Sequence, residues 1–373
     1  MADEQTYYLG IEATGRTVAL LAGPDGEILG EGTATSAVYS VMGQERSSQA
    51  LWTAIIGAFS SAGINTRDLL QANLPLPDVA AICIGMTGVE RPKDESQVRR
   101  ILDRFNLTKN ITVTSDAHIV LEAGCNLENF SDPAYGVAVV AGETGLAFAK
   151  GRDGRTARAG GWGYLLGEEG SAYWLGLQAV KVLLRAADGR GDETALAAMV
   201  EHEWKIPANR PDSLAQRVYS LLQGLGTGGN KAQLEESQET YKRTLAGLAP
   251  LVERAAANGD DVAAAILDEA TDHLAEAATA AIARVGLDEP DTAPAPAKSS
   301  TFQIGGMAFN LGGSSQSQSK IPFAIYGSVL LSNPGQLRAR LQAALPQCDD
   351  PIAVLNPAEG AVRLALRSHQ GQS

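Results

Sequence analysis

Two short segments of the sequence combine glycine, threonine and charge in a way that could hold a phosphate group. Residues 12–17 read EATGRT and residues 142–145 read GETG, and each segment lies between two apolar runs. A tight turn there can present backbone N–H groups to an anion, while Thr14 or Thr17 adds a hydroxyl and Arg16 a positive charge. Each segment alone is also consistent with an ordinary hairpin turn. Their occurrence as a matched pair, in a chain without a Walker loop, favours two turns that hold the phosphates of a nucleotide.

Two acidic residues could carry the chemistry that accompanies a phosphate group. Asp116 follows a predicted strand at 111–115 and opens a predicted helix, where it could cap the helix and also hold Mg²⁺ or its water shell. Glu90 follows a predicted buried strand at 79–87, and a carboxylate at this edge could accept a proton from a substrate hydroxyl. The alternative interpretation of Glu90 is a solvated loop charge.

A glycine-rich stretch, GGWGYLLGEEGSAYW at residues 160–174, is the most informative part of the sequence. Glycine adds conformational entropy to the unfolded chain, so five glycines within eleven residues need a reason other than intrinsic propensity. Close approach of the backbone to a ligand is the better explanation. Trp162 offers a flat apolar face and an N–H donor that suit a sugar ring, and Glu168 can accept hydrogen bonds from hydroxyls. The alternative is a turn that caps a helix, with Tyr173 and Trp174 in the core.

The predicted elements around these residues form two similar halves. Residues 7–32 predict three short antiparallel strands, and residues 135–160 repeat this meander about 128 residues later. Helices and strands alternate between the two meanders, with helices at 47–63 and 96–105, and from 168 to about 285 the chain is mainly helical. Strands at 323–328 and 352–355 and helices from 334 and 357 complete the second half, whereas 288–300 and 312–319 are low-complexity loops. The sequence therefore predicts a duplicated α/β unit arranged as a two-lobed clamp.

The charge balance limits the partners of such a clamp. The 373 residues include 30 Lys and Arg against 43 Asp and Glu, a net charge of −13, so the field of the protein opposes binding to nucleic acid or anionic lipid. An anionic substrate must then be held by local devices such as backbone N–H groups or a metal ion. The sequence starts with acidic and polar residues, and no apolar run approaches the ~18 residues of a membrane span. We therefore expect a cytoplasmic protein that binds neither nucleic acid nor membrane.

The glycine-rich stretch closely resembles the signature of the N-acetylglucosamine kinases and of the related BadF/BadG/BcrA/BcrD ATPase family, in the superfamily of sugar kinases, heat-shock chaperones and actin. The resemblance spans nearly the whole chain and includes LGIEATG at 9–15, VTSDAHIVLEAG at 113–124, YGVAVVAGETG at 135–145, YGSVLLS at 326–332 and PAEGAVRLAL at 357–366. It implies an α/β, two-lobed actin-like ATPase fold made of duplicated ribonuclease-H-like units. The lobes would comprise residues 1–120 and 121–373, the second with a helical insertion at about 168–285.

The resemblance also implies a role for each candidate residue. The protein would phosphorylate an amino sugar, with N-acetylglucosamine as the first candidate, and would use ATP and Mg²⁺. A homodimer is one assembly that the resemblance allows. Glu90 stands at the position of the catalytic Asp. The positions for phosphate and Mg²⁺ are Glu12, Thr14, Gly15, Asp116, Gly142, Thr144 and Gly145, with Asp116 as the metal ligand. The adenosine positions are Gly327 and Ser328, and the sugar positions are Gly161, Trp162 and Glu168.

Several departures from the family pattern surround this one site. The first turn is one residue shorter and has fewer glycines than usual, Glu90 and Glu168 replace Asp, and Ala37 replaces an Asn expected to contact the sugar. GETG replaces GTGS, which puts Glu143 where phosphate oxygens approach. We expect Glu143 to turn outward, because a carboxylate facing the phosphates would repel them.

Three functions follow from this pattern. The leading one is an ATP- and Mg²⁺-dependent amino sugar kinase in which Glu12, Gly15, Asp116, Gly142 and Gly145 line one interlobe cleft. The alternative is a non-catalytic relative that binds sugar or nucleotide as a regulator. The third, an ATPase that drives a redox partner, is disfavoured because the cysteines at 83, 125 and 348 show no pattern typical of an iron–sulfur cluster.

Overall fold

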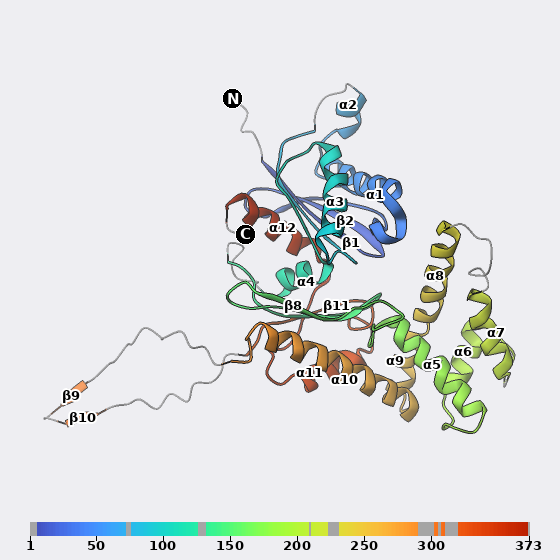
Figure 1. Cartoon of the computed structure of the whole chain (residues 1–373). Helices are drawn as coiled ribbons and strands as arrows, with labels where there is room; N and C mark the ends of the chain where they lie inside the picture. Colours follow the sequence, from blue (N-terminus) through green and yellow to red (C-terminus); the bar gives the residue numbers. More distant parts are fainter. Residues whose placement is uncertain are drawn as a thin grey trace, which may run out of the picture.

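The protein consists of two lobes, each built on a five-stranded sheet that helices cover (Figure 1). The computed structural model describes residues 6–71, 76–125, 132–208, 210–222, 231–289, 302–304, 307–309 and 320–371. Within these ranges no helix is both long and apolar enough to cross a membrane. The two sheets confirm the predicted two-lobed α/β architecture.

The N-terminal sheet has the strand order β3-β2-β1-β4-β5. β1 (Tyr7–Ala13), β2 (Arg16–Ala22) and β3 (Ile28–Thr35) form the predicted antiparallel meander, while β4 (Val79–Met86) and β5 (Ile111–Thr114) extend the sheet in parallel with β1. β1, β2 and β4 are apolar and buried nearly throughout, as strands covered on both faces must be. Because β1, β4 and β5 run in parallel, their carboxyl ends meet at one edge of the sheet. Glu12, Thr87 and Asp116 lie at that edge.

The C-terminal sheet repeats this plan with the order β12-β11-β6-β7-β8. β6 (Gly136–Ala141), β7 (Gly145–Lys150) and β8 (Thr156–Gly160) form the second antiparallel meander. β11 (Phe323–Tyr326) and β12 (Ile352–Ala353) then continue in parallel with β6. In each sheet the first strand of the meander is central and the third is at the edge, which confirms the predicted duplication.

The helices bury the apolar faces of the two sheets. α1 (Tyr39–Ser61) and α3 (Pro92–Phe105) cover one face of the N-terminal sheet, with α2 (Thr66–Gln71) beside α1. α12 (Ala358–His369) covers the other face of that sheet through Ala361, Val362 and Ala365. α12 therefore packs with the N-terminal lobe, although the predicted boundary assigned residues 121–373 to the other one. α4 (Asp116–Gly124), which follows β5, packs on the C-terminal sheet instead.

Each lobe thus receives a helix from the other part of the chain, α12 on the N-terminal sheet and α4 on the C-terminal sheet. The lobes are joined where these two helices cross. A Cβ on Gly360 of α12 would lie 1.9 Å from the carbonyl oxygen of Ile119, and a Cβ on Gly10 of β1 would lie 2.4 Å from the backbone nitrogen of Val362. Both contacts are closer than any side chain allows, so these positions need glycine for the backbones to approach. The crossing is thus set by backbone contact.

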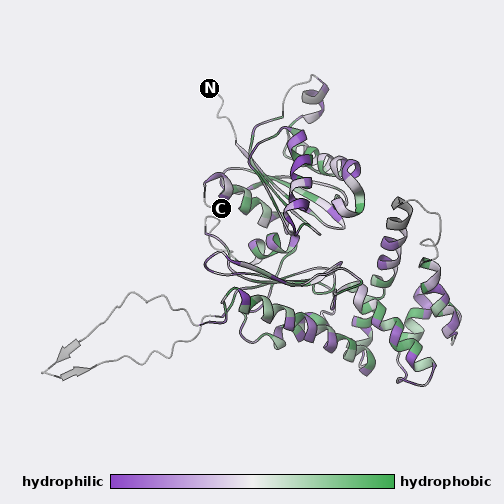
Figure 2. Cartoon of the chain, viewed as in Figure 1, coloured by the Kyte–Doolittle hydropathy of each residue, from purple (hydrophilic) through white to green (hydrophobic). Residues whose placement is uncertain are grey.

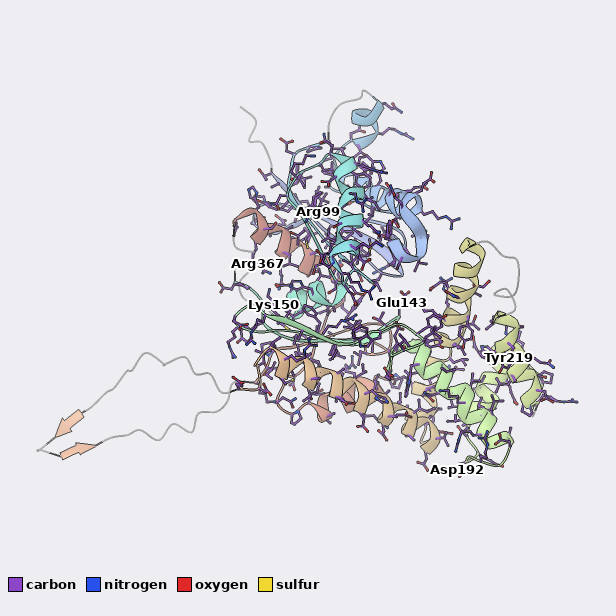
Figure 3. All side chains as sticks on the ribbon, in the orientation of Figure 1. Arg99, Glu143, Lys150, Asp192, Tyr219 and Arg367 are labelled. Carbon is purple, nitrogen blue, oxygen red and sulfur yellow. The ribbon has the colours of Figure 1, made fainter. Side chains whose placement is uncertain are left out.

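A buried ion cluster lies beside this crossing and is centred on Glu122 of α4. Its carboxylate contacts Arg367 of α12 at 2.5 Å and Lys150 of β7 at 2.8 Å. Burial alone would raise the pKa of Glu122, but hydrogen bonding to His118 and the charges of Arg367 and Lys150 outweigh it and lower the pKa to about 2. In Figure 3, Lys150 and Arg367 lie at one end of the boundary between the lobes and Glu143 lies toward the other. The cluster therefore ties the lobes together away from Glu143.

The rest of the C-terminal lobe is helical, as predicted from residue 168 onward. α10 (Asp261–Arg284) lies against β7 and β8, with α9 (Ala249–Ala257) and α11 (Gln336–Ala344) beside it. α5 (Ala172–Ala187), α6 (Leu196–Trp204), α7 (Pro211–Leu222) and α8 (Lys231–Ala246) form the insertion. Figure 2 shows green apolar and purple polar stripes along these helices, the pattern of helices that bury one side.

The structure also differs from the sequence expectations in detail. α1 begins at Tyr39 rather than 47 and is kinked at Gly43, whose φ of 70° is left-handed. α3 begins at Pro92 rather than 96, because proline suits the first helical position. Ser115, not Asp116, is the N-cap of α4: its hydroxyl accepts from the His118 backbone N–H. β9 (Phe302–Ile304) and β10 (Met307–Phe309) form an unpredicted hairpin. Most of the predicted low-complexity loops lie outside the described residues.

Candidate functional site

The two hairpin turns singled out in the sequence have the same internal geometry. In the first, the Thr14 backbone N–H donates to the Arg16 carbonyl at 2.9 Å, and in the second Gly142 donates to Thr144 at 3.0 Å. The strand registers that flank them, Ala13 with Thr17 and Ala141 with Gly145, correspond as well. Residues 15 and 143 are therefore equivalent, and each is the tip of its turn.

The two turns face each other across a cavity of about 540 Å³ between the lobes. Its lining includes seven of the predicted site residues, from both turns, from α4 and from the segment after β11: Thr14, Gly15, Asp116, Gly142, Thr144, Gly327 and Ser328. Arg16, Thr87, Glu143 and Tyr326 also line it. Segments far apart in the sequence thus meet in the single interlobe cleft that paired phosphate turns require.

Two predicted residues lie behind the surface of this cavity. Gly145 packs against the glycine-rich loop, where a Cβ would lie 2.2 Å from the Glu169 carbonyl oxygen. Glu12 is 1% exposed, and its Oε1 accepts a hydrogen bond of 2.5 Å from the Tyr326 hydroxyl and one of 3.3 Å from Thr14. Both residues therefore support the residues that line the cavity and do not line it themselves.

Asp116 is held rigidly at the carboxyl edge of the N-terminal sheet. Its Oδ2 accepts from the Thr87 hydroxyl at 2.7 Å, and its Oδ1 accepts from the Ala117 backbone N–H at 2.8 Å. Burial raises the pKa of Asp116, although these hydrogen bonds act in the opposite direction. A lone pair on each oxygen stays available for a ligand from the cavity.

The acidic residues at this edge fit a magnesium ion. Burial raises the pKa of Glu12, Asp116 adds to that rise, and Glu12 Oε2 is buried without a hydrogen-bond partner among the described residues. A cation or its bound water would satisfy that oxygen. Within the described part of the chain no group of three or more metal-ligating side chains occurs. Mg²⁺ is commonly held by one or two carboxylates together with water and substrate phosphates, so the arrangement suits it.

Gly327 and Ser328 lie against the second turn. A Cβ on Gly142 would lie 3.1 Å from Gly327 Cα, so the two backbones are in close contact. Gly327 has a left-handed φ of 109°, and a Cβ there would lie 2.3 Å from the Ala141 carbonyl oxygen, so this position needs glycine. Beyond them a smaller cavity of about 250 Å³ opens toward α8. It is lined by Gly142, Glu143, Ala172, Tyr173, Glu239, Lys242, Arg243, Ala246, Gly247 and Ser328. The two cavities share residues of the second turn, so a ligand as long as a nucleotide could occupy both.

Glu143 points toward the opposite turn. A Cβ on Gly15 would lie 2.2 Å from Glu143 Oε1, so the carboxylate fills the space in front of the first turn. The expectation that Glu143 turns outward is therefore wrong; Gly15 has no side chain to displace it. Burial raises the pKa of Glu143 and Glu239 raises it further, while Lys242 and Arg243 of α8 lower it.

Glu90 does not line the 540 Å³ cavity; through Arg158 it is connected to the glycine-rich loop. It forms an ion pair with Arg158 of β8, and the guanidinium carbon of Arg158 lies 4.8 Å from the ring centre of Trp162. Arg158 also donates to the Gly161 carbonyl at 3.2 Å. Trp162 is 64% exposed, so its ring is available to a ligand. The structure thus groups Glu90, Gly161 and Trp162, which the sequence assigned to the base and the sugar side.

The glycine-rich loop is fixed to the second turn at both ends. The Gly161 backbone N–H donates to the Gly145 carbonyl, and the Ala172 N–H donates to the Gly142 carbonyl, each at 2.9 Å. Glu168 lies within this loop but is 8% exposed, and its Oε2 has no described hydrogen-bond partner. Burial raises the pKa of Glu168 to about 7 despite the nearby charge of Lys242. Its backbone carbonyl faces Gly145. The role of its side chain toward a sugar stays a prediction.

Some residues at the site were not found from the sequence. Arg158 contacts Glu90, Tyr326 contacts Glu12, and Thr87 orients Asp116. Tyr326 directly precedes the adenosine motif and Thr87 directly follows β4, so position alone could have indicated both. Ala37, in contrast, is fully buried in the N-terminal core and offers no polar group to a sugar.

Comparison with known proteins identifies the class to which this site belongs. Residues 12–330 match the BadF/BadG/BcrA/BcrD ATPase family. Because the match covers most of the chain, including both turns and the glycine-rich loop, the protein belongs to this family. The resemblance inferred from the sequence motifs is confirmed.

Two curated relatives are kinases of amino sugars. An N-acetylmuramic acid/N-acetylglucosamine kinase of Clostridium acetobutylicum is 29% identical over 199 residues, which are 53% of this chain and 57% of the relative. An N-acetyl-D-glucosamine kinase of Dictyostelium discoideum is 27% identical over 217 residues, 58% of this chain and 61% of the relative. The chain thus matches less than two thirds of the length of either relative.

Solved structures agree with the fold. A candidate N-acetylglucosamine kinase from Chromobacterium violaceum superposes with a TM-score of 0.58 at 22% identity, over 96% of this chain and 98% of that one. Another from Porphyromonas gingivalis superposes with a TM-score of 0.60 at 16% identity, over 98% of this chain and 100% of that one. These likenesses extend across both lobes and establish the shared architecture.

Proposed function

We propose that the protein transfers the γ-phosphate of ATP to a hydroxyl of an amino sugar in the presence of Mg²⁺. N-acetylglucosamine is the first candidate substrate. The observation that carries this proposal is the pair of equivalent turns that face each other across the 540 Å³ cavity, with Asp116 at the sheet edge between them. Membership of an ATPase family and the amino sugar kinases among its relatives support the same conclusion.

ATP would lie across the two connected cavities. The backbone N–H groups of the turns around Gly15 and Gly142 would bind the phosphates, with Thr14 and Thr144 supplying hydroxyls. Gly327 and Ser328 would face the adenosine. Lys242 and Arg243, in the smaller cavity, would offset part of the phosphate charge.

Asp116, which lines the cavity, would hold Mg²⁺, and Glu12 behind it would act through the water shell of the metal. A bound divalent cation neutralises negative charge on the phosphates, which is its main contribution to phosphoryl transfer. Thr87 and Tyr326 keep the two carboxylates in place through the hydrogen bonds described above. This orientation is built into the protein by packing at the carboxyl edge of the N-terminal sheet.

Glu90 would act as the base on the sugar side. The sugar hydroxyl oxygen forms the bond to the γ-phosphorus, its proton passes to the Glu90 carboxylate, and the bond from that phosphorus to the ADP oxygen breaks. Burial raises the pKa of Glu90, which brings its proton affinity closer to neutral pH. Trp162 would lie against the sugar ring.

A coupled ADP-release assay with ATP, Mg²⁺ and a panel of amino sugars tests the proposal. We expect turnover with N-acetylglucosamine or N-acetylmuramic acid, and its loss in Asp116→Asn. Asp153→Asn is the matched control, because Asp153 is exposed and pairs only with Arg155 at the β7–β8 turn among the described residues. ADP release that is independent of every sugar, or absent altogether, would contradict the kinase.

The position of Glu143 favours one second candidate, a non-catalytic binding protein. A carboxylate in front of the first turn opposes a phosphate there. Such a protein would bind a sugar, measured by thermal shift or calorimetry, without any release of ADP. Binding of sugar with no turnover at saturating ATP would select this candidate over the kinase.

A further inference from the structure

Arg158 is a single side chain that connects the two lobes on the sugar side of the cleft. It lies on β8, the edge strand of the C-terminal sheet, and its ion-pair partner Glu90 follows β4 of the N-terminal sheet. The Arg158 side chain is 19% exposed and that of Glu90 is 29% exposed. The same guanidinium group bonds the Gly161 carbonyl and faces the Trp162 ring.

We propose that Arg158 is a positioning residue that holds the Glu90 carboxylate beside the predicted sugar residues Gly161 and Trp162. This inference rests on the proposed kinase function, in which Glu90 receives the proton of the sugar hydroxyl. Arg158 acts through Glu90 and not on the reacting atoms.

The three contacts of Arg158 explain how it can fix a carboxylate. Its planar guanidinium offers several N–H donors in a rigid fork and a flat face that stacks on an aromatic ring. The Gly161 carbonyl and the Trp162 ring therefore orient the fork before Glu90 reaches it. A lysine has the charge but neither the fork nor the flat face.

A longer base needs such a tether. Glutamate has one more rotatable bond than aspartate, and each such bond has three staggered positions, so an untethered Glu90 would adopt the required position roughly three times less often. Fixing that bond also costs side-chain entropy, which the ion pair with Arg158 offsets. The replacement of Asp by Glu at position 90 and the presence of Arg158 are thus two parts of one arrangement.

The charges around Glu90 determine the direction of the pH effect. Arg158 of β8 pairs with it, while Asp116 of α4 and Arg91, its neighbour in the chain, act on it through their charges. Burial raises the pKa of Glu90 and Asp116 adds to this, whereas Arg158 and Arg91 lower it. Without Arg158 the Glu90 pKa must rise further. The base would then stay protonated up to a higher pH, so on acidification the activity would fall at a higher pH than in the parent.

Arg158→Ala and Arg158→Lys test the inference against Arg155→Ala as a control. Arg155 precedes the same strand, but it is 64% exposed and pairs with Asp153 at the surface. For Arg158→Ala we expect kcat at pH 7 to fall by roughly 10- to 100-fold, a fraction of what a general base contributes, and the acid limb of kcat/KM to move up by about one pH unit. The KM for ATP should stay within about twofold. Arg158→Lys should restore the acid limb but not the full kcat, and Arg155→Ala should match the parent.

A readout without turnover separates this inference from the kinase proposal. The fluorescence of Trp162, isolated by subtracting that of a Trp162→Phe variant, should follow the titration of Glu90 through the stacked guanidinium. We expect this transition in the parent and its absence in Glu90→Gln. In Arg158→Lys, which keeps the positive charge, the midpoint should stay close to that of the parent.

The possible failures are distinct. If no sugar is phosphorylated but the Trp162 transition disappears in Glu90→Gln, the kinase proposal fails and the link between Arg158 and Glu90 stands. If Arg158→Ala lowers kcat equally at every pH with an unmoved acid limb, or if the Trp162 transition persists in Glu90→Gln, the inference is overturned.

Discussion

Replacing Glu143 with threonine should strengthen ATP binding, because its carboxylate stands in front of the first turn. Two like charges about 4 Å apart repel by about 4 kcal/mol at an effective dielectric of 20 and by about 1 kcal/mol in bulk water. The cleft is open to solvent, and Lys242 and Arg243 offset part of the negative charge. Screening therefore reduces the expected gain to about 1–3 kcal/mol, a Kd roughly 5- to 150-fold lower.

Calorimetric titration of ATP into the parent, Glu143→Thr and Glu143→Gln measures this gain. The glutamine variant keeps the size of the side chain and removes only its charge, so the two variants separate repulsion from steric obstruction. Glu276→Thr is the control, because Glu276 is exposed on α10. Each titration is repeated with EDTA in place of Mg²⁺, since repulsion acts without the metal.

The pH dependence gives an independent check. The surroundings raise the pKa of Glu143, so acidification neutralises this carboxylate in the folded protein sooner than a free one. ATP affinity of the parent should therefore rise, relative to that of Glu143→Gln, as pH falls through the Glu143 pKa. The ATP phosphates titrate in both proteins, and the difference between them cancels that contribution.

Several results would refute this reasoning. Unchanged or weaker binding in both variants would mean that the phosphates avoid the first turn or that Glu143 moves aside at no cost. Weaker binding only when Mg²⁺ is present would make Glu143 a metal ligand. A gain well above about 150-fold, in a parent protein without turnover, would exceed what screened repulsion gives. It would instead show that the native residue blocks the phosphate site, and the non-catalytic candidate would be the better one.

Three further substitutions have expected outcomes. Glu90→Gln should lower kcat by ~10²–10⁴-fold in steady-state assays with little change in sugar binding, and an unchanged kcat would move the base to another carboxylate. Glu122→Gln should cost roughly 3–5 kcal/mol in urea unfolding because it leaves the charge of the buried Arg367 without an opposite charge. The Glu122 pKa falls from 4.5 to about 2 on folding, so its stabilisation is present above pH 4.5 and is lost toward pH 2; equal pH profiles of parent and variant would contradict this. Gly360→Ala should lower the unfolding free energy by roughly 1–3 kcal/mol, since its Cβ would meet the Ile119 carbonyl, and an unchanged midpoint would argue against the crossing described here.

Local patterns explain why the two turns could be predicted from the sequence. Each turn lies between apolar strands that pair with their immediate neighbours, so the hairpin is encoded within about twenty residues. Asp116 was found for the same reason, because it directly follows a strand at the carboxyl edge of the sheet. The resemblance of the glycine-rich stretch then connected these turns to a known family.

Contacts between the lobes could not be predicted in this way. Tyr326 and Glu12 are 314 residues apart, and their hydrogen bond depends on how the two sheets are oriented. The pairing of Glu90 with Arg158 likewise joins different lobes. The packing of α12 on the first sheet depends on a close backbone contact at Gly10, and its crossing with α4 depends on one at Gly360; neither glycine has a local signature. Glu143 was assigned the wrong direction because repulsion from a ligand was considered without the empty space beside Gly15.

The departures from the family pattern are accommodated by residues that they meet in space. The extra carboxylate at 143 faces Gly15, the one residue type that leaves room for it at the equivalent tip. Glu90, one methylene longer than the Asp of the family pattern, is paired with Arg158, which itself is oriented by the glycine-rich loop. That loop is bonded to the second turn through Gly161 and Ala172, so backbone hydrogen bonds join the surroundings of Arg158 to the second turn. Loss of function by drift would leave such changes without matched partners, and their pairing therefore supports a working site of altered geometry over a decayed one.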